Sequence, residues 1–201
     1  MNKSDIEIYM DFDMVIVNTI DAIVKLYNED FSFYEGFRTI CSEQIKTYDF
    51  KELTCAKKEQ IDTYFNTPRF FEELWFIKNA EQSINELNKY FSVSIVTLGN
   101  QPNLALKEAW IYWYWQNITF IGVDIRSHQD KSSVNMADGI FVDDKLSNLE
   151  TSNARYKILF GDEYEWNRDY DPQKVYRCHD WDGVMKTINK ITAYKIIGRT
   201  R

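Results

Sequence analysis

The sequence is poor in cysteine, proline and glycine, and it has no long apolar run. Its three cysteines, Cys41, Cys55 and Cys178, form no CxxC pair, which argues against a disulfide framework or a zinc knuckle. Three prolines and seven glycines exclude a collagen-like or linker-rich chain. No window reaches the roughly 18 to 20 apolar residues of a membrane span, and the acidic start lacks the basic-then-apolar form of a signal peptide. We therefore expect a soluble cytoplasmic protein that contacts no membrane.

Positive charge is also scarce. The 24 Lys and Arg residues face 31 Asp and Glu residues, which leaves a formal net charge of -7. Binding along polymeric nucleic acid depends on many cations that neutralise phosphates, so this charge argues against that class of partner. A small phosphorylated molecule stays compatible with the charge if a metal ion supplies the positive charge. The hydrophobic fraction of 44% is high enough for a compact globular protein with a full core.

Short apolar, β-branched runs recur along the chain, and segments of helical period lie between most of them. The runs are IEIYMD, FSVSIVTL, ITFIGV, GIFVDD and YKILF. Runs of this kind separated by helices predict a Rossmann-like α/β fold, with a mainly parallel sheet flanked by helices. Residues 18–71 read as helices without a strand, so we expect a small helical cap inserted after the first strand. The predicted core domain comprises residues 1–17 and 72–201.

Polar residues stand where several of these runs end. In parallel α/β sheets, ligands bind beyond the carboxyl ends of the strands, so these residues are candidates for a functional site. They are Asp11 and Asp13 after the first run, Thr97 in the second, Asp143 and Asp144 in the fourth, and Lys131 shortly before the fourth. Asp11, Asp143 and Asp144 repel one another as neighbours unless a proton or a cation compensates them. An oxygen-only set without His or Cys favours Mg²⁺.

The two N-terminal aspartates indicate a reaction. Asp13 lies two residues beyond Asp11 and past the end of the strand, where the loop can reorient its side chain. One of the two carboxylates can attack phosphorus while the other protonates the leaving oxygen and then activates water. Thr97 can hydrogen-bond a phosphate oxygen, and Lys131 can neutralise charge on the group that is transferred.

Four segments resemble, in order, the four motifs of the haloacid dehalogenase-like (HAD) phosphatases. MDFDMVIVNT resembles the first motif, SIVTLGN the second, HQDKSSV the third and GIFVDDK the paired-acid fourth. TPRFFEELWFIKNAEQSINEL and KEAWIYWYW are further similar to segments of the 5'(3')-deoxyribonucleotidases of that superfamily. The resemblance runs from about Ile8 to Lys145.

The resemblance implies a Mg²⁺-dependent phosphomonoesterase of the 5'-nucleotidase type. Such an enzyme hydrolyses a deoxynucleoside monophosphate to nucleoside and phosphate through an aspartyl-phosphate intermediate. Carried onto this sequence, Asp11 is the nucleophile, and Asp13 is the acid and base whose backbone carbonyl also binds the metal. Asp143 and Asp144 complete the metal site, with Asp144 as the expected direct ligand.

The same resemblance implies the remaining contacts of the substrate, a small phosphate ester. Thr97 and Lys131 hold the phosphate, and Phe70 and Phe71 reach from the cap junction to the base or the sugar. The helix that contains AWIYWYW carries apolar residues on nearly every face, which predicts a homodimer through that helix.

One departure from the family pattern keeps alternatives open. Met14 stands where the family has Gly, at a position where backbone freedom and close packing are both useful. One alternative is a HAD phosphatase for another small ester, such as a sugar phosphate or a nucleic-acid 3'-phosphate end. Another is a phosphate-binding protein of the same fold with weakened catalysis. The intact pair of Asp11 and Asp13 argues against the second alternative.

Overall fold

The computed structural model describes residues 4–199, which form a six-stranded sheet in the order β3-β2-β1-β4-β5-β6. All neighbouring strands pair in parallel. The strands are β1 (Glu7–Met10), β2 (Ser92–Gly99), β3 (Thr119–Asp124), β4 (Ile140–Asp143), β5 (Tyr156–Phe160) and β6 (Tyr176–Cys178). The first five coincide with the five apolar runs, so the predicted parallel α/β sheet is confirmed. The sequence did not predict β6, because three residues are too few to show a period.

The helices lie mostly where the helical period predicts them. They are α1 (Thr19–Asp30), the 3₁₀ helix η1 (Ser42–Gln44), α2 (Lys58–Tyr64), α3 (Pro68–Glu72), α4 (Ala80–Tyr90), α5 (Gln101–Tyr114), α6 (Leu146–Thr151) and α7 (Trp181–Arg199). Side chains cap several of them: Asn18 accepts from Asp21 N at the start of α1, and Asn100 accepts from Asn103 N at the start of α5.

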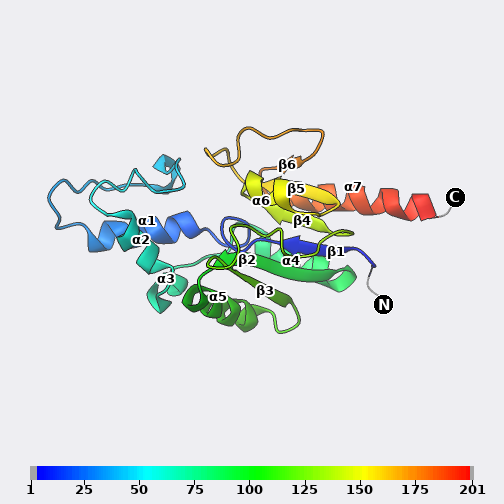
Figure 1. The fold of residues 1–201 in the computed structure, drawn as a ribbon, viewed down its shortest axis with the longest axis horizontal. Helices are drawn as coiled ribbons and strands as arrows, with labels where there is room; N and C mark the ends of the chain where they lie inside the picture. Colours follow the sequence, from blue (N-terminus) through cyan, green and yellow to red (C-terminus); the bar gives the residue numbers. More distant parts are fainter. Residues whose placement is uncertain (1–3, 200–201) are drawn as a thin grey trace.

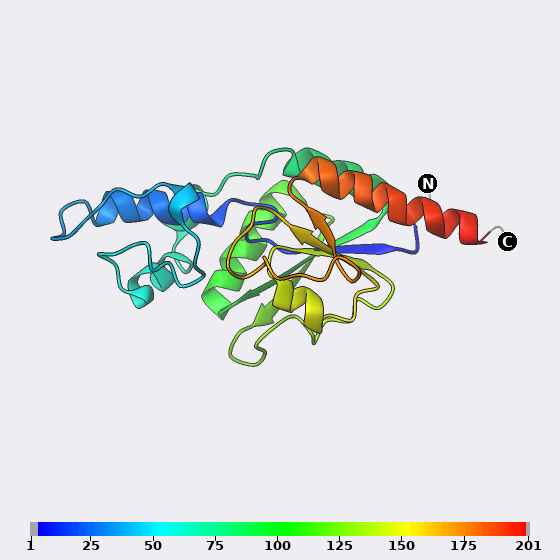
Figure 2. The same ribbon diagram turned by 90° about the horizontal axis from the view of Figure 1, so that it is seen from above.

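Two apolar clusters, one on each face of the sheet, form the core. On one face, residues such as Ile8, Ile95 and Ile158 pack with residues of α4, α5 and α7. On the other face, Tyr9 and Phe141 pack with residues such as Leu149 of α6. Figure 2 shows α4 and α7 on one side of the sheet and α6 on the other. Because both faces are covered, the strands are mainly apolar, and the acids Asp11 and Asp143 stand at the carboxyl ends of β1 and β4.

Residues 18–71, which we call the insertion, lie beyond one end of the sheet. Figure 1 shows α1, α2 and α3 on the side toward which the arrow of β1 points, so the insertion faces the carboxyl ends of the strands. The chain enters and leaves through two paired segments, 16–18 and 75–77, which we call the neck. In the neck, Asn18 N donates to Trp75 O at 3.1 Å, and Ile77 N donates to Ile16 O at 2.9 Å. The ends of the predicted core domain, residues 1–3, 200 and 201, lie outside the described residues.

A tight turn follows β1 and leads into the neck. Met14 has a φ of 54°, in the left-handed region where L residues other than Gly, Asn and Asp are uncommon. Two backbone hydrogen bonds close the turn: Met14 N donates to Val17 O at 2.9 Å, and Ile16 N donates to Phe12 O at 3.0 Å. This backbone conformation is one that Gly adopts most readily, and this chain adopts it with a methionine.

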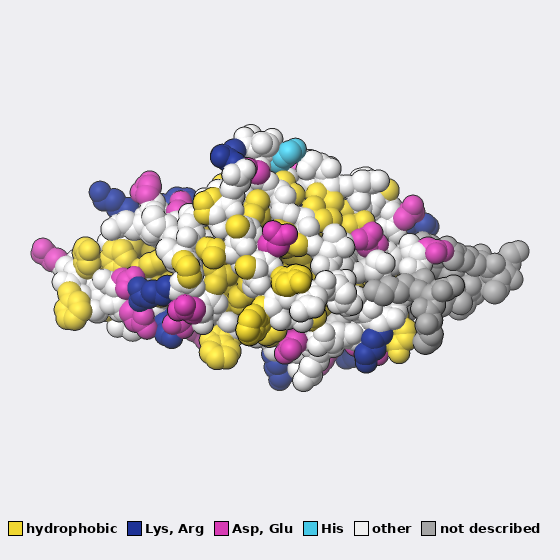
Figure 3. Space-filling model, turned by 90° about the horizontal axis from the view of Figure 1, so that it is seen from below, with side chains coloured by type: hydrophobic (Ala, Val, Ile, Leu, Met, Phe, Trp, Pro, Cys, Tyr) yellow, Lys and Arg dark blue, Asp and Glu magenta, His cyan; other side chains and the backbone are white. Residues whose placement is uncertain are grey.

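Helix α5 leaves aromatic side chains exposed along the edge of the molecule. Figure 3 shows apolar side chains gathered on the face seen from below, toward which α5 lies in Figure 1. Tyr112 is 61% exposed and Trp113 is 83% exposed. The homodimer through this helix stays a prediction. None of the helices within residues 4–199 combines the length and the apolar character that a membrane span requires.

Candidate active site

Strand register brings the predicted acidic residues together. Strands β1 and β4 are neighbours, with Met10 opposite Val142, and Asp11 N continues the ladder by donating to Val142 O at 2.9 Å. Asp11 therefore leaves β1 at the level where β4 ends in Asp143 and is followed by Asp144. Lys131 comes from the connection between β3 and β4. We call Asp11, Lys131, Asp143 and Asp144 the acidic cluster.

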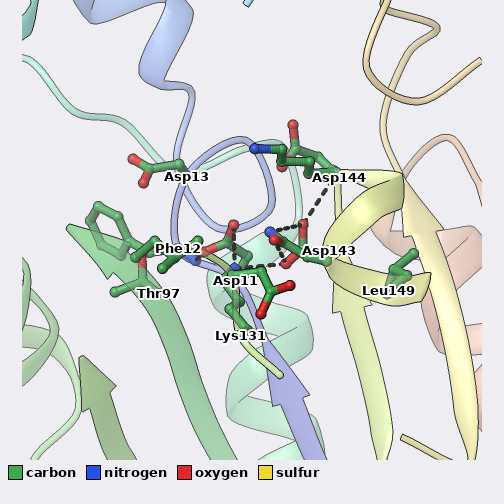
Figure 4. Close-up of polar contacts among 12 residues, drawn as sticks. Asp11, Phe12, Asp13, Thr97, Lys131, Asp143, Asp144 and Leu149 are labelled. Carbon is green, nitrogen blue, oxygen red and sulfur yellow. Dashed lines mark hydrogen bonds and ion pairs between the residues drawn. The ribbon is translucent and has the colours of Figure 1, made fainter. Parts of the chain in front are cut away.

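Lys131 bridges two of the three carboxylates. Its Nζ lies 2.7 Å from Asp11 Oδ2 and 2.6 Å from Asp143 Oδ2, as the dashed lines in Figure 4 show. Lys131 and Asp143 are fully buried, and Asp11 and Asp144 are nearly so. Asp143 also accepts from Lys145 N at 2.8 Å and from Asn148 Nδ2 at 3.1 Å. These bonds fix the positions of the carboxylates.

Burial changes the proton affinity of the cluster. Loss of solvation raises the pKa of Asp11 to about 6, although the nearby charge of Lys131 opposes this rise. Burial and the charges of Asp143 and Asp11 raise the pKa of Asp144 well above its ordinary value. For Lys131, burial favours the neutral amine, but the charges of Asp11 and Asp143 outweigh it and raise the pKa. Asp11 and Asp144 therefore hold a proton more readily than exposed aspartates do, because the single charge of Lys131 does not offset burial and the neighbouring carboxylates.

The donor set of the cluster fits a hard divalent cation. Asp11, Asp143 and Asp144 each offer one carboxylate oxygen, and these oxygens all lie within 4.8 Å of one another. Mg²⁺ typically binds one or two carboxylates together with water and substrate phosphate oxygens, whereas softer metals prefer nitrogen or sulfur ligands. A bound cation would also offset the burial and the neighbouring negative charges that raise the pKa of Asp11 and Asp144.

Asp13 lies apart from the acidic cluster and is held by different partners. Figure 4 shows its side chain directed away from Asp11. Asp13 pairs with Lys107 Nζ, and its Oδ1 accepts from Thr19 Oγ1 at 2.9 Å. Lys107 Nζ also donates to Thr97 Oγ1 at 2.9 Å and to Leu98 O at 3.0 Å. Lys107 therefore links two predicted site residues, Asp13 and Thr97.

Lys107, which is 1% exposed, is a site residue that was not predicted from the sequence. A weak signal was present: Lys107 lies three residues after Leu104 and four before Ile111, a spacing that puts all three on the same side of the helix. A buried lysine needs an acidic partner, and the predicted strand ends supply acids. Asn148 was also missed, although it follows the paired acids by four residues and helix α6 turns it back toward Asp143.

A cavity of about 430 Å³ opens above these residues. Asp11, Asp13 and Asp144 line its base. Aromatic side chains of the insertion line its side, and we call them the aromatic wall: Tyr48, Phe50 and Phe65. Met14, from the turn after β1, also lines the cavity. The arrangement places a charged base below an apolar wall, which suits a small ligand with a phosphate at one end and a ring at the other.

Phe70 and Phe71 lie outside the residues that line this cavity. Phe70 is fully buried and packs with Phe65 and Phe71, at ring centroid distances of 5.1 Å and 5.4 Å. Phe71 packs at 6.4 Å from the ring of Phe12. The structure therefore places the two predicted substrate-binding aromatics in the packing between the insertion and the sheet. Phe65, which lies five residues before Phe70 and between α2 and α3, lines the cavity instead.

Sequence comparison finds relatives over nearly the whole chain. A family model described as 5' nucleotidase, deoxy (pyrimidine), cytosolic type C protein matches residues 4–195. A curated 5'(3')-deoxyribonucleotidase of Clostridium acetobutylicum is 28% identical over 190 residues, which cover 90% of this chain and 92% of the relative.

Solved structures with low sequence identity share the fold. The putative HAD-hydrolase YfnB from Bacillus subtilis, bound to magnesium, superposes with a TM-score of 0.60 at 13% identity and covers 93% of this chain and 100% of its own. A haloacid dehalogenase-like family hydrolase from Streptococcus pneumoniae superposes with a TM-score of 0.57 at 13% identity, covering 91% of this chain and 98% of its own. These likenesses confirm the predicted fold class.

Proposed function

The chain belongs to the family described as 5' nucleotidase, deoxy (pyrimidine), cytosolic type C protein, and from that membership we propose that it hydrolyses deoxynucleoside monophosphates. The sequence resemblance to HAD phosphatases is thereby confirmed, and the chain is a phosphoric monoester hydrolase. The proposed products are a nucleoside and inorganic phosphate. The family description also supports a cytoplasmic location and a small-molecule substrate, in keeping with the formal charge of -7.

The observation that carries the proposal is the position of Asp11 in the acidic cluster. Its carboxylate lies at the base of the cavity, where a phosphate would enter, and Lys131 contacts its Oδ2. We propose that the oxygen of Asp11 attacks phosphorus and that the ester bond to the leaving oxygen breaks. Asp13 gives its proton to that oxygen and then removes a proton from water, which attacks the aspartyl phosphate and frees Asp11.

Lys107 and Thr19 would orient Asp13 for these proton transfers, because both bind its carboxylate. Lys131 and Thr97 would hold the phosphate oxygens, as the family resemblance implies. Thr97 is fully buried, and its hydroxyl contacts Lys107, so Lys107 couples the phosphate contact to the acid and base. Positioned donors of this kind stabilise charge that develops on the transferring group.

Mg²⁺ is the proposed cofactor. Asp11, Asp143 and Asp144 would hold it, together with the backbone carbonyl of Asp13. The ion would supply positive charge that attracts the phosphate and stabilises the charge developing on it during transfer. The magnesium in the YfnB structure and the three converging carboxylates support this assignment.

The insertion would act as the cap that selects the substrate. Residues 18–71 supply the aromatic wall of the cavity, against which the base and sugar would lie. Aromatic rings suit the flat face of a nucleobase. Phe70 and Phe71 would act there through Phe65, against which Phe70 packs.

A substrate panel tests the proposal. Purified full-length protein is incubated with Mg²⁺ and with dUMP, dTMP, the matching ribonucleotides and several sugar phosphates, and released phosphate is measured. We expect the deoxynucleotides to be preferred, EDTA to stop release and added Mg²⁺ to restore it. A clear preference for sugar phosphates would contradict the substrate assignment, and turnover that is indifferent to EDTA would contradict the cofactor.

A further inference from the structure

The loop between β5 and β6 places a tryptophan against the acidic cluster. Trp166 Nε1 donates a hydrogen bond to Asp144 Oδ2 at 2.8 Å, from 22 residues further along the chain. Trp166 also lines the cavity beside Asp144. Neither the sequence motifs nor the proposed reaction assigns a role to this residue.

The indole ring of Trp166 is held by its own loop. It stacks on Tyr164, with ring centroids 4.4 Å apart and planes 2° from parallel. Asn167, which is fully buried, closes this turn: its Oδ1 accepts from Tyr164 N at 2.8 Å and its Nδ2 donates to Asp162 O at 3.0 Å. The direction of the indole N–H is therefore set before any ligand arrives.

The same loop contacts the insertion. The ring of Tyr48 meets that of Trp166 edge-on, at a centroid distance of 5.8 Å and an angle of 78°. Glu165 N donates to Lys46 O at 3.3 Å, and Lys46 Nζ lies 5.7 Å from the ring of Tyr164. Trp166 thus stands between the acidic cluster and the aromatic wall and is packed from both sides.

The partner of Asp144 differs in charge from those of the other two acids. Lys131, a cation, contacts Asp11 and Asp143, whereas Trp166 offers Asp144 a neutral donor. An indole N–H donates one hydrogen bond and accepts none, so it can orient a carboxylate without neutralising it. Trp166 therefore fixes one of the two oxygens of Asp144 without bringing a positive charge that would compete with a bound cation.

We propose that Trp166 is a positioning residue for the cation site: its indole N–H holds Asp144 Oδ2 so that the other oxygen, Oδ1, is presented to Mg²⁺. This inference rests on the proposed function, because it assumes that the acidic cluster binds that ion. Groups that orient a metal ligand from outside typically change metal affinity by about 10- to 100-fold when they are removed.

The test measures Mg²⁺ binding directly, by isothermal titration calorimetry of the full-length protein, together with phosphate release as a function of Mg²⁺ concentration. Trp166→Phe keeps a ring to stack on Tyr164 but lacks the N–H donor. Trp166→Leu is a second variant that lacks the donor, and Trp113→Phe is the matched control, because Trp113 is 83% exposed and lies outside the residues that line the cavity. Thermal unfolding in EDTA shows whether each variant is folded.

We expect Trp166→Phe to weaken Mg²⁺ binding by about tenfold, while kcat at saturating Mg²⁺ stays within about threefold of the original and the control stays unchanged. A purely structural role would instead lower stability in EDTA and leave the affinity of the folded protein for Mg²⁺ unaltered. If the original protein binds Mg²⁺ and releases phosphate but a folded Trp166 variant binds Mg²⁺ equally well, the inference is overturned and the proposed function stands. If the original protein binds no Mg²⁺, the inference and the proposed cofactor both fail, and phosphate release from the substrate panel decides the proposed hydrolysis separately.

Discussion

The acidic cluster and the aromatic wall face each other across one cavity, but the molecule builds them differently. The cluster consists of charged side chains that are at most 8% exposed and are fixed by adjacent parallel strands. The wall consists of apolar rings on irregular segments of the insertion, and one of them, Tyr48, is 61% exposed. Buried charges are costly to displace, whereas an exposed ring on a loop moves easily. The contrast predicts that the cluster determines the rate of the reaction and the wall determines which substrate binds.

The largest effect is expected from the nucleophile. Asp11→Asn should lower kcat by more than about 10³-fold, because an amide oxygen cannot form the aspartyl phosphate. The fold should be retained, since the side chain keeps its size and the charge that burial opposes is removed. Phosphate release and thermal unfolding are the measurements. Turnover near the original rate would exclude the covalent route and would remove the cluster from the chemistry.

A smaller loss of rate is expected at Lys107, which links Thr97 to Asp13, the proposed acid and base. Lys107→Met should lower kcat by about 10²-fold, because Asp13 loses the partner that orients it. Glu108→Gln is the matched control, since Glu108 is the exposed neighbour of Lys107 on α5. Steady-state kinetics of both variants make the comparison. An unchanged kcat in Lys107→Met would show that Asp13 needs no such support.

A substitution in the aromatic wall should change substrate binding rather than the rate of the reaction. Tyr48→Ala should raise KM for a deoxynucleoside monophosphate by about five- to tenfold, in line with the typical strength of base stacking on an aromatic ring, while kcat changes by less than about twofold. Phe33→Ala is the control, because Phe33 belongs to the same insertion, is 96% exposed and lies outside the residues that line the cavity. A fall in kcat with unchanged KM would break the proposed division of roles.

The smallest effect concerns the stability of the metal-free protein. The pKa of Asp11 is raised to about 6 in the folded state, above its value in an unfolded chain. Between about pH 4 and pH 6, Asp11 therefore holds a proton more often in the folded state than in the unfolded state, so the contribution of Asp11 to stability falls as pH rises through that range. Asp11→Asn should reduce this loss by on the order of 1 to 2 kcal/mol. Urea unfolding in EDTA at several pH values measures the free energy of unfolding. If it changes equally with pH in the original protein and in Asp11→Asn, this prediction is wrong.

The acids at the base of the cavity could be predicted from the sequence, because their places at the ends of apolar runs indicate where they lie in a parallel sheet. Apolar runs end in Asp11 and Asp143, and parallel strands that are neighbours in a sheet end at the same edge. Lys107 and Trp166 escaped prediction for the opposite reason. A helix and a loop carry them to the site from distant parts of the chain, and periodicity does not show where such side chains arrive.

Which aromatic residue faces the cavity could not be predicted either. Phe65, Phe70 and Phe71 lie within seven residues of one another and are chemically alike. Their directions depend on the short helix α3, which begins at Pro68 and turns Phe70 and Phe71 toward the core. The sequence shows that aromatic residues occur shortly before the neck. Only the path of the backbone determines which ring packs in the core and which lines the cavity.

The neck has an evolutionary consequence. Its two segments lie side by side and are joined by backbone hydrogen bonds between Asn18 and Trp75 and between Ile77 and Ile16. A segment whose ends are held together can be lengthened, shortened or exchanged with little disturbance to the backbone on either side. Mutations that remodel the insertion therefore leave Asp11 in place, and a gene of this design can acquire a new substrate while it inherits the old chemistry.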